Sequence, residues 1–303
     1  MEVNDIERKE YIKSLKKKRQ GNWKIVWKRL SKNRLAMTAM MFFIFLILLA
    51  VFAGLIFDVE KTMNTNLPMR NMPPGTEGHP LGTDPFGRDI LVRLVFGLRV
   101  TLILGFASAI FSSLVGAILG ASSGYFGGIF DVALMRVLEV VSSVPGILIT
   151  LVIVTGFGGG LWQMLVAITI GQMAGFTRLI RSTSLSVAGL EYVEVAKAMG
   201  ANNLHIIFRH IIPNVMGTIL VQGAIAVSGN ILLGTMLGFL GLGVPAPTPE
   251  WGSMLLDGLH YMRYYPYLIA IPGIAITLTV IAANIFGDGL RDAFDPRLKG
   301  EKG

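Results

Sequence analysis

The sequence predicts an all-α integral membrane protein with six transmembrane helices. Apolar residues make up 52% of its 303 positions, charged residues only 15%, and the mean hydropathy is +0.61. A soluble domain of this length needs more polar surface than that. The chain also contains six apolar stretches of about 20 residues, the length at which a helix crosses a bilayer.

The first predicted span, 35–57, is an unbroken apolar run. The other five are interrupted by Gly or Pro, as packed membrane helices tolerate, and we place them at 100–122, 133–157, 161–180, 215–241 and 267–286. Pro145 lies inside the third span. Glycine recurs at every fourth position of the second, which predicts close helix packing: Gly116, Gly120 and Gly124.

Lysine and arginine are concentrated before the first span, where residues 1–34 contain twelve of them. Because basic residues beside a span stay on the cytoplasmic side, we expect this segment to be cytoplasmic. After six crossings the tail, 289–303, is expected on the same side, and residues 58–96 lie outside. The expected location is the cell membrane, inner or plasma, with multiple passes.

The basic segment also contains a helical repeat of apolar residues at i, i+3, i+4 and i+7: Trp23, Val26, Trp27 and Leu30. Interleaved with basic residues, this pattern predicts an amphipathic helix in the inner interface, in contact with membrane lipid. A nucleic-acid-binding arm would also be basic. Beside a membrane span, topology and lipid headgroups account for the charge, so no nucleic-acid partner is expected.

A second surface helix is predicted after the fifth span, with Thr248 as N-cap and Pro249 at the first helical position. One face of it is apolar: Trp251, Met254, Leu255, Gly258, Leu259 and Met262. We favour a helix that rests on the bilayer. A docking surface for an extracytoplasmic partner is the alternative.

Residues 181–213, between the fourth and fifth spans, predict two short helices outside the bilayer. The first has an apolar stripe at i, i+3, i+4 and i+7: Tyr192, Val195, Ala196 and Met199. Gly200 follows, where a left-handed residue would end the helix. The second pattern comprises Leu204, Ile207, Phe208 and Ile211. Pro213 then marks the start of the fifth span. The exposed stripe either lies on the membrane or fits a groove on another protein.

Residues 194–213 resemble the coupling-loop motif of ABC importer permeases, which is Glu-Ala-Ala, three residues, Gly, nine residues, Ile-x-Leu-Pro. Four residues match the motif in register: Glu194, Ala196, Gly200 and Pro213. Val195 departs from the first Ala and Ile212 stands for Leu, and both keep the stripe apolar.

Further motifs of the peptide/nickel importer branch follow in order over more than 200 residues. They occupy 79–84, 87–89, 124–128, 191–194, 239–243, 247–252, 287–292 and 295–297, with Asp131, Arg178, Arg181 and Leu185 between them. Each motif is weak alone, and their joint order is strong. The combination resembles the second, shorter permease of dipeptide and oligopeptide importers.

The resemblance implies a type I ABC importer permease fold, with a permease core at 97–288. It implies a heterodimer with a homologous permease, two cytoplasmic ABC ATPases that hold ATP and Mg²⁺, and an extracytoplasmic substrate-binding protein. This chain would form half of a pathway for di- or oligopeptides, with nickel chelates and other solutes as further candidates. The coupling residues that it implies are Tyr192, Glu194, Val195, Ala196, Met199, Gly200 and Pro213.

Polar residues inside spans are functional candidates by default. Glu139 lies three residues after Arg136, and we favour mutual neutralisation near the inner surface over a place in the pathway. Three amides either line a hydrated path or join helices: Gln172, Asn230 and Asn284. Glu139 stands where the family often has Asp, and Gly234 and Gly238 replace more polar residues. These departures touch the expected pathway and leave the substrate open.

The sequence contains no recognisable catalytic, nucleotide-binding or metal-binding motif. It has no cysteine and no phosphate-cradling Gly-x-x-x-x-Gly-Lys-Ser/Thr, so we expect no metal site, no bound cofactor and no catalytic residue. His205 and His210 are five residues apart, a spacing that does not place both on one α-helical face. A gradient-driven transporter would show an internal repeat, and an intramembrane enzyme would show paired carboxylates or a Ser/Lys arrangement; neither is evident.

Overall fold

The computed structural model describes residues 23–295, apart from the side chains of residues 61 and 62. Parts of the predicted segments 1–34 and 289–303 therefore lie outside the described residues. Within the described range the regular elements are helices. Two isolated β-bridges pair Thr76 with His79 and Thr83 with Asp89. The predicted all-α class is confirmed.

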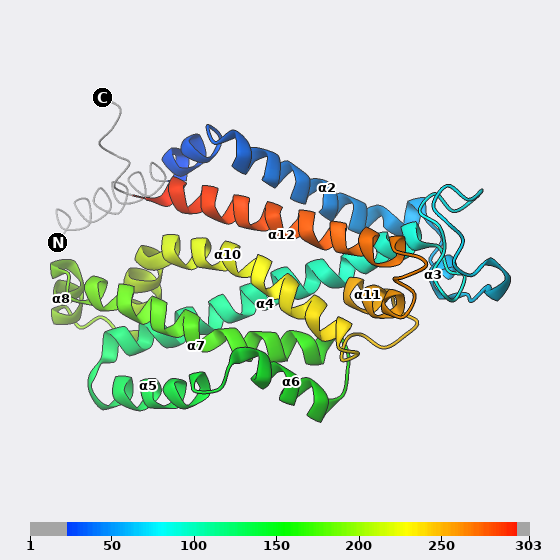
Figure 1. Cartoon of the computed structure of the whole chain (residues 1–303). Helices are drawn as coiled ribbons and strands as arrows, with labels where there is room; N and C mark the ends of the chain where they lie inside the picture. The colour runs from blue at the N-terminus through cyan, green and yellow to red at the C-terminus, as the bar shows by residue number, and fades with distance from the viewer. Residues whose placement is uncertain (1–22, 296–303) are drawn as a thin grey trace.

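Five long apolar helical segments run lengthwise beside one another (Figure 1): α2 (Arg34–Ile56), α4 (Ile90–Phe126), α7 (Leu161–Ala188), α10 (Ile212–Phe239) with the turns before it, and α12 (Tyr267–Phe294). Helix α4 packs on α2, α7 and α10, and α12 packs on α2 and α10. Each is long and apolar enough to cross a membrane, in agreement with five of the six predicted spans.

The third predicted span, 133–157, is broken in the structure. It consists of α5 (Gly128–Ser142) and α6 (Gly146–Phe157), which meet at an angle of 79° and lie beside α7 (Figure 1). Pro145 is the N-cap of α6. A proline lacks the backbone N–H and disfavours a helical residue before it, so the break falls at this position. The two helices form a sixth span if they count as one.

The second predicted span, 100–122, is longer than expected because a side chain caps it earlier. The carboxylate of Asp89 accepts the N–H of Val92 at 3.0 Å, and α4 starts directly after it. The predicted close packing is confirmed. A Cβ at Gly116 would lie 2.5 Å from the Cβ of Phe176, and one at Gly120 would lie 2.6 Å from the carbonyl oxygen of Thr177.

The fifth predicted span, 215–241, begins earlier in the structure. The four residues of α9 (Asn203–Ile206), the π-helical turn η2 (Ile207–Ile211) and α10 form one continuous helical segment. Helix α10 itself starts at Ile212, within one residue of the predicted Pro213, but it continues from the preceding turns without a break. Pro213 lies in the first turn of α10, directly after the wide π-turn, and the helix continues through it.

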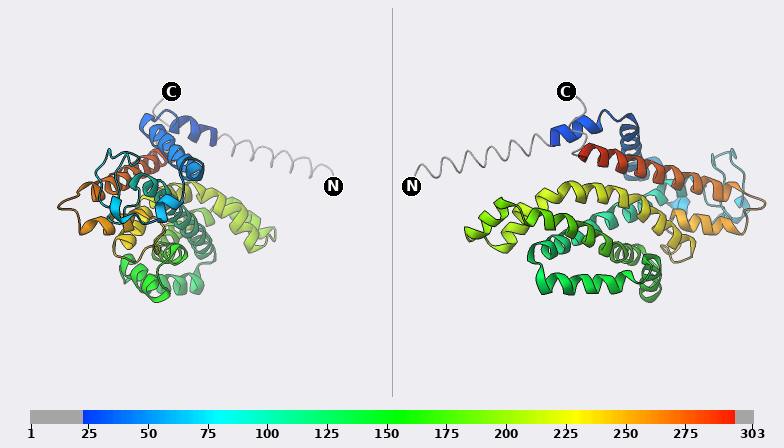
Figure 2. Two further views of the ribbon diagram at one scale, coloured as in Figure 1. Left: turned by 90° about the vertical axis from the view of Figure 1, so that its right-hand side faces the viewer. Right: turned by 60° about the vertical axis from the view of Figure 1, so that its left-hand side comes forward.

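The helix of residues 23–30 divides its predicted apolar stripe between two environments. Val26 and Leu30 pack on the last turns of α12, and the ring of Trp23 meets that of Phe294 edge-on at 5.7 Å. Trp27 is 55% exposed. Figure 2 shows this helix against the end of α12. Three of the four stripe residues thus contact protein, and Trp27 remains for the predicted lipid contact.

The surface helix after the fifth span is α11 (Trp251–Leu259), and two expectations about it are wrong. Its N-cap is Glu250 and not Thr248, because the Glu250 carboxylate accepts the N–H groups of Gly252 and Ser253. Most of its apolar face is covered by protein and not by the bilayer, whereas Leu259 and Met262 at its end stay exposed. The Trp251 side chain is only 2% exposed and donates its indole N–H to the Leu94 carbonyl at 2.8 Å.

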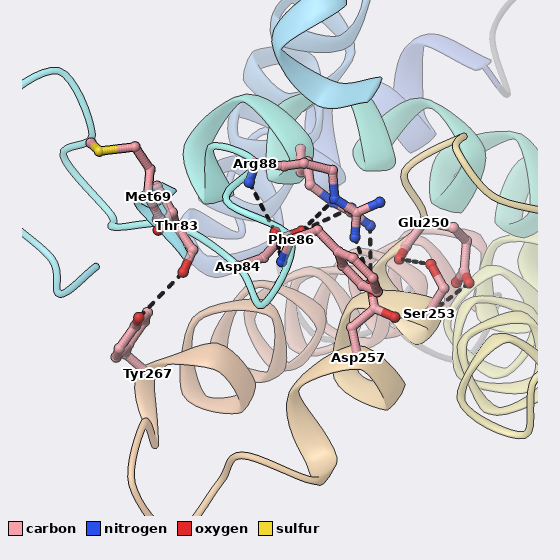
Figure 3. A network of polar contacts seen from close by, with 10 residues as sticks. Met69, Thr83, Asp84, Phe86, Arg88, Glu250, Ser253, Asp257 and Tyr267 are labelled. Carbon is pink, nitrogen blue, oxygen red and sulfur yellow. Dashed lines mark hydrogen bonds and ion pairs between the residues drawn. The ribbon is translucent and has the colours of Figure 1, made fainter. Parts of the chain in front are cut away.

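The segment between α2 and α4 contains α3 (Glu60–Met63) and the 3₁₀ turn η1 (Leu67–Met69). A buried ion network holds its last part against α4 and α11 (Figure 3). Asp84 accepts from Arg88 at 2.6 Å and from Arg93 at 2.9 Å, and Arg88 also reaches Asp257 at 3.0 Å. The hydroxyl of Tyr267 donates towards the carbonyls of residues 72 and 83. This network anchors the loop to the helix bundle.

Candidate coupling site

The predicted helix after the fourth span is present as α8 (Glu191–Ala198), at one end of the molecule (Figure 1). Glu191 and Glu194 lie in its first turn and Lys197 in its last. Acidic residues at the N-terminus and a base at the C-terminus complement the helix dipole. The local sequence therefore stabilises a short helix in the place where the motif predicts one.

Gly200 ends α8 as predicted. Its φ is +79°, its N–H donates to Lys197 O at 3.0 Å, and the next N–H, of Ala201, donates to Ala196 O at 3.1 Å. This pair of bonds is the Schellman motif, which requires a left-handed residue at the turn. A side chain with a Cβ is strained in that conformation, so glycine is the residue that closes this corner without cost.

The apolar stripe of α8 is rotated from its predicted position. Ala196 is buried as part of the stripe, but so is Val193, which the periodicity placed outside it. The remaining predicted stripe side chains are exposed: Tyr192 at 37%, Val195 at 54% and Met199 at 78%. Leu204 and Phe208 are exposed as well. We call Tyr192, Val195, Met199, Leu204 and Phe208 the coupling patch.

The inward face of α8 is set by the helical segment that follows. Ile206, Ile207 and Ile211 are almost completely buried and cluster with Val193 and Ala121 of α4. Burial of these side chains fixes α8 to the bundle and leaves the coupling patch facing away from it. Partial burial raises the pKa of the Tyr192 phenol.

The expectation that His205 and His210 lie on different faces is wrong. In the π-turn a residue lies above the one five positions earlier, and the two imidazole rings are 5.8 Å apart. The ring of Tyr192 lies 6.0 Å from that of His210. Within residues 23–295 no group of three or more His, Cys, Asp or Glu side chains could hold a metal ion. The two histidines are a ring pair at the edge of the coupling patch.

The four polar side chains predicted near the pathway are not gathered at one place. Glu139 lies on α5, where its carboxylate pairs with Arg136 at 2.8 Å, and both side chains are exposed. That contact has the geometry of mutual neutralisation. Gln172 on α7 is half-buried and Asn284 on α12 is exposed.

Asn230 is completely buried between α10 and α4. Its amide nitrogen donates to the hydroxyl of Ser108 at 2.8 Å. Its carbonyl oxygen is one of the few buried side-chain atoms without a hydrogen-bond partner in the described part of the chain. The contact joins two helices, as one of the alternatives from the sequence expects, and the pathway role of all four residues stays a prediction.

The two glycine departures, Gly234 and Gly238, are closely packed on the side where a Cβ would stand. A Cβ at Gly234 would meet the side chain of Leu104 at 3.0 Å, and a Cβ at Gly238 would lie 2.0 Å from Glu250 Oε2. Glu250 was not among the predicted site residues, although the predicted helix start at Thr248 and Pro249 lies directly before it. The pairing of Asp131 with Arg181, whose two motifs were noted separately, was not predicted either.

The carboxyls at the other end of the molecule have shifted pKa values. Burial raises the pKa of Glu250 to about 7, against the two backbone hydrogen bonds that lower it. Burial also raises the pKa of Asp257, and the nearby Arg88 guanidinium opposes that shift. The two ends of the molecule thus differ: the α8 end exposes the apolar coupling patch, and the α11 end contains buried carboxyl groups.

A bundle of long apolar helices with a short capped helix projecting at one end is the architecture of an importer permease. The chain belongs to the family described as binding-protein-dependent transport system inner membrane component, whose family model matches residues 112–300. A second family model, the N-terminal TM domain of oligopeptide transport permease C, matches residues 21–74. The protein is thus a membrane permease, as its motifs predicted.

Several curated proteins are similar over most of their length. The dipeptide transport system permease protein DppC of Alkalihalophilus pseudofirmus is 40% identical, over 91% of this chain and 90% of that protein. The oligopeptide transport system permease protein OppC of Bacillus subtilis is 37% identical, over 94% and 93%. The glutathione transport system permease protein GsiD of Pectobacterium atrosepticum is 37% identical, over 91% and 92%.

A solved structure has the same fold. An inward-facing MetNI methionine ABC transporter structure superposes with a TM-score of 0.54 at 19% identity, covering 67% of this chain and 97% of the matched chain. At that identity the likeness concerns the fold alone. It confirms the predicted ABC importer permease fold.

Proposed function

We propose that this chain is one of two permease subunits of an ATP-driven importer for di- or oligopeptides, and that α8 couples it to the ATPases. The observation that carries the coupling role is the coupling patch. Five apolar side chains stand exposed on a short helix pair that is fixed to the bundle by its other face. Exposed apolar patches of this kind mark protein or membrane contacts, and the coupling-loop motif at residues 194–213 favours the protein contact.

The proposed partner at the patch is a cytoplasmic ATPase. In this proposal the exposed side chains of Tyr192, Val195 and Met199 fill the ATPase groove. Ala196 packs α8 against the bundle, and Gly200 forms the turn that ends α8. Glu194 supports the helix start. Pro213 lies at the start of α10, where motion of the loop would enter the bundle.

The proposed orientation places the coupling patch in the cytoplasm. The helix of residues 23–30, which is rich in lysine, lies towards the same end of the molecule as α8, and α11 lies at the other (Figure 1). Basic residues on the α8 side agree with the positive-inside rule. The loop before α4, together with α11, would then face the binding protein.

The proposed assembly contains a second, homologous permease, two ATPases and a substrate-binding protein. ATP and Mg²⁺ would be held by the ATPases, and this chain would carry no catalytic group. The substrate proposal rests on the relatives, whose names specify dipeptide, oligopeptide and glutathione transport. Peptides are the chemistry that these names share.

Purification in mild detergent tests the assembly. We expect a tagged copy of the chain, extracted from its native membranes, to bring down a second permease and one or two ATPases, identified by mass spectrometry. Recovery of the chain alone, also after crosslinking through Lys197, would remove the support for the coupling role.

A substitution in the patch tests the contact itself. Val195→Asp together with Met199→Asp places two charges in the proposed groove, and we expect the ATPases to be lost while the second permease is retained. Met262→Asp is the matched control, because Met262 is 55% exposed in the turn after α11, at the opposite end of the molecule. Loss of the ATPases from both variants would show a general defect in place of a specific contact.

A further inference from the structure

The junction between α10 and α11 contains a buried carboxyl group that the proposed function does not use. Glu250 is 1% exposed, the lowest value among the acidic side chains of the described residues. It caps α11 by accepting Gly252 N–H at 2.7 Å and Ser253 N–H at 2.8 Å. Figure 3 shows Glu250 and Ser253 beside each other at the start of that helix.

Three glycines make room for this carboxyl. A Cβ at Gly238 would lie 2.0 Å from Oε2, one at Gly243 would lie 3.0 Å from Oε2, and one at Gly252 would lie 2.8 Å from Oε1. Gly238 belongs to the last turn of α10 and Gly252 to the first turn of α11. The carboxyl therefore fills the space in which the two helices meet.

The arginines around this junction pair with carboxylates other than Glu250, and Arg93 Nε is buried without a hydrogen-bond partner in the described residues. On α4, Arg93 bonds to Asp84 and Asp257, and Arg88 bonds to the same two carboxylates. On α12, the Tyr267 hydroxyl donates to backbone carbonyls. In the described residues, none of these groups forms an ion pair or hydrogen bond with Glu250, whose side-chain partners are the two amides.

A carboxylate in such a site is costly, because a buried charge without a counterion loses its hydration. The protonated form avoids that cost. We propose that Glu250 is a proton-binding positioning residue that fixes the end of α10 to α11, and that it holds this junction most firmly when the carboxyl is protonated. The inference goes beyond the proposed function, since it needs neither the ATPases nor a substrate.

The junction is connected to the coupling patch through a single helical segment. The helical segment from Asn203 to Phe239 is continuous, so its one end is the α9–η2 turn beneath the coupling patch and its other end is Gly238 in the Glu250 cage. Because the segment is continuous, a contact between Glu250 and its Gly238 end restrains how the whole segment, including its end at the coupling patch, can shift.

The direction of the pH effect follows from linkage. Burial raises the Glu250 pKa from 4.5 to about 7 in the folded protein. Between these values the folded state holds a proton that the unfolded chain has released, so the contribution of Glu250 to stability falls as pH rises through this window. Stability at acidic pH is retained and stability at alkaline pH is reduced.

The first experiment compares thermal unfolding of the intact membrane assembly with that of its Glu250→Gln variant, at about pH 5 and about pH 8. Glutamine keeps the shape and cannot ionise. We expect the Tm of the unmodified protein to fall by a few degrees more than that of Glu250→Gln between the two pH values. Glu77→Gln is the control, because Glu77 is an exposed glutamate in the loop before α4, and it should keep the full pH dependence.

The second experiment tests the cage geometry. Gly238→Ala should lower the Tm, whereas Gly229→Ala on the same helix, with nothing within 4 Å of its Cβ, should not. Combining Gly238→Ala with Glu250→Ser, which vacates the space and keeps a capping hydroxyl, should restore most of the loss. Equal pH dependence of Glu250→Gln and unmodified protein, or strictly additive effects of the two substitutions, would overturn the proposal.

Discussion

The carboxylate of Asp131 on α5 accepts two hydrogen bonds from the guanidinium of Arg181 on α7, fifty positions later in the chain. The hydroxyl of Ser123 on α4 donates to the same carboxylate. One side chain thus joins three helices at the end of the bundle near α8. Two-pronged pairing of arginine with a carboxylate is strong and directional, so this contact fixes the angle at which α5 leaves α4.

We predict that Asp131 and Arg181 are energetically coupled. A double-mutant cycle with Asp131→Ala and Arg181→Ala should give a coupling of about 1–3 kcal/mol, because the pair is partly buried and shares hydrogen bonds. The exposed pair Arg136 and Glu139 on α5 is the control, and its cycle should give about 0.5 kcal/mol or less. Thermal unfolding of the detergent-solubilised assembly measures both, and equal couplings would contradict the prediction.

Gly200→Val should uncouple ATP hydrolysis from transport. A β-branched residue at φ +79° costs about 1–3 kcal/mol, which opens the Schellman turn and moves α8 from its place. We expect peptide uptake to fall several-fold while ATPase activity continues. Gly189→Val is the control, since Gly189 has φ −85° and open space around its Cβ. Unchanged uptake by the Gly200 variant would count heavily against the coupling role.

The glycine row of α4 should be sensitive to a single methyl group. Gly120→Ala places a Cβ against the backbone of α7 and should cost about 1–3 kcal/mol through overpacking. Gly175→Ala adds the same atom on α7 where nothing lies within 4 Å, so it should be neutral or slightly stabilising. The Tm values of the two variants provide the comparison, and the prediction fails if both shift alike.

The amides of the spans should separate by substitution to alanine. Asn230→Ala removes the bond to Ser108 and should destabilise the protein by about 1–3 kcal/mol. Asn284→Ala, at an exposed position, should leave the Tm unchanged and lower peptide uptake if this side of α12 lines the pathway. An uptake equal to that of the unmodified protein would remove Asn284 from the pathway residues.

Local features were predictable where the physical cause is local. The spans follow from apolar runs, and the corner at Gly200 follows from a helix pattern that stops before a glycine. The break at Pro145 was visible as a proline but not as a bend of 79°, because the angle depends on how α5 and α6 pack on α7. The start of α10 near Pro213 was predictable, but its continuity with the preceding turns was not, because a π-turn before Pro213 keeps the helix unbroken.

Faces were harder to predict than helices. Periodicity placed Val193 outside the stripe of α8, yet it is buried because the isoleucines of α9 and η2 lie beside it. The apolar face of α11 was assigned to the bilayer, but α4, α10 and α12 cover its first two turns. An apolar periodicity shows which face of a helix is buried away from water, but it does not show whether lipid or protein contacts that face.

The sequence by itself determined the membrane class, the approximate place of five spans, the coupling-loop motif and the family, because composition, periodicity and short motifs are written in contiguous residues. Only the tertiary structure decided which contacts join different helices: Asp131 with Arg181, and Glu250 in the space above Gly238. These depend on how helices far apart in the chain pack against one another, and no local pattern specifies that geometry.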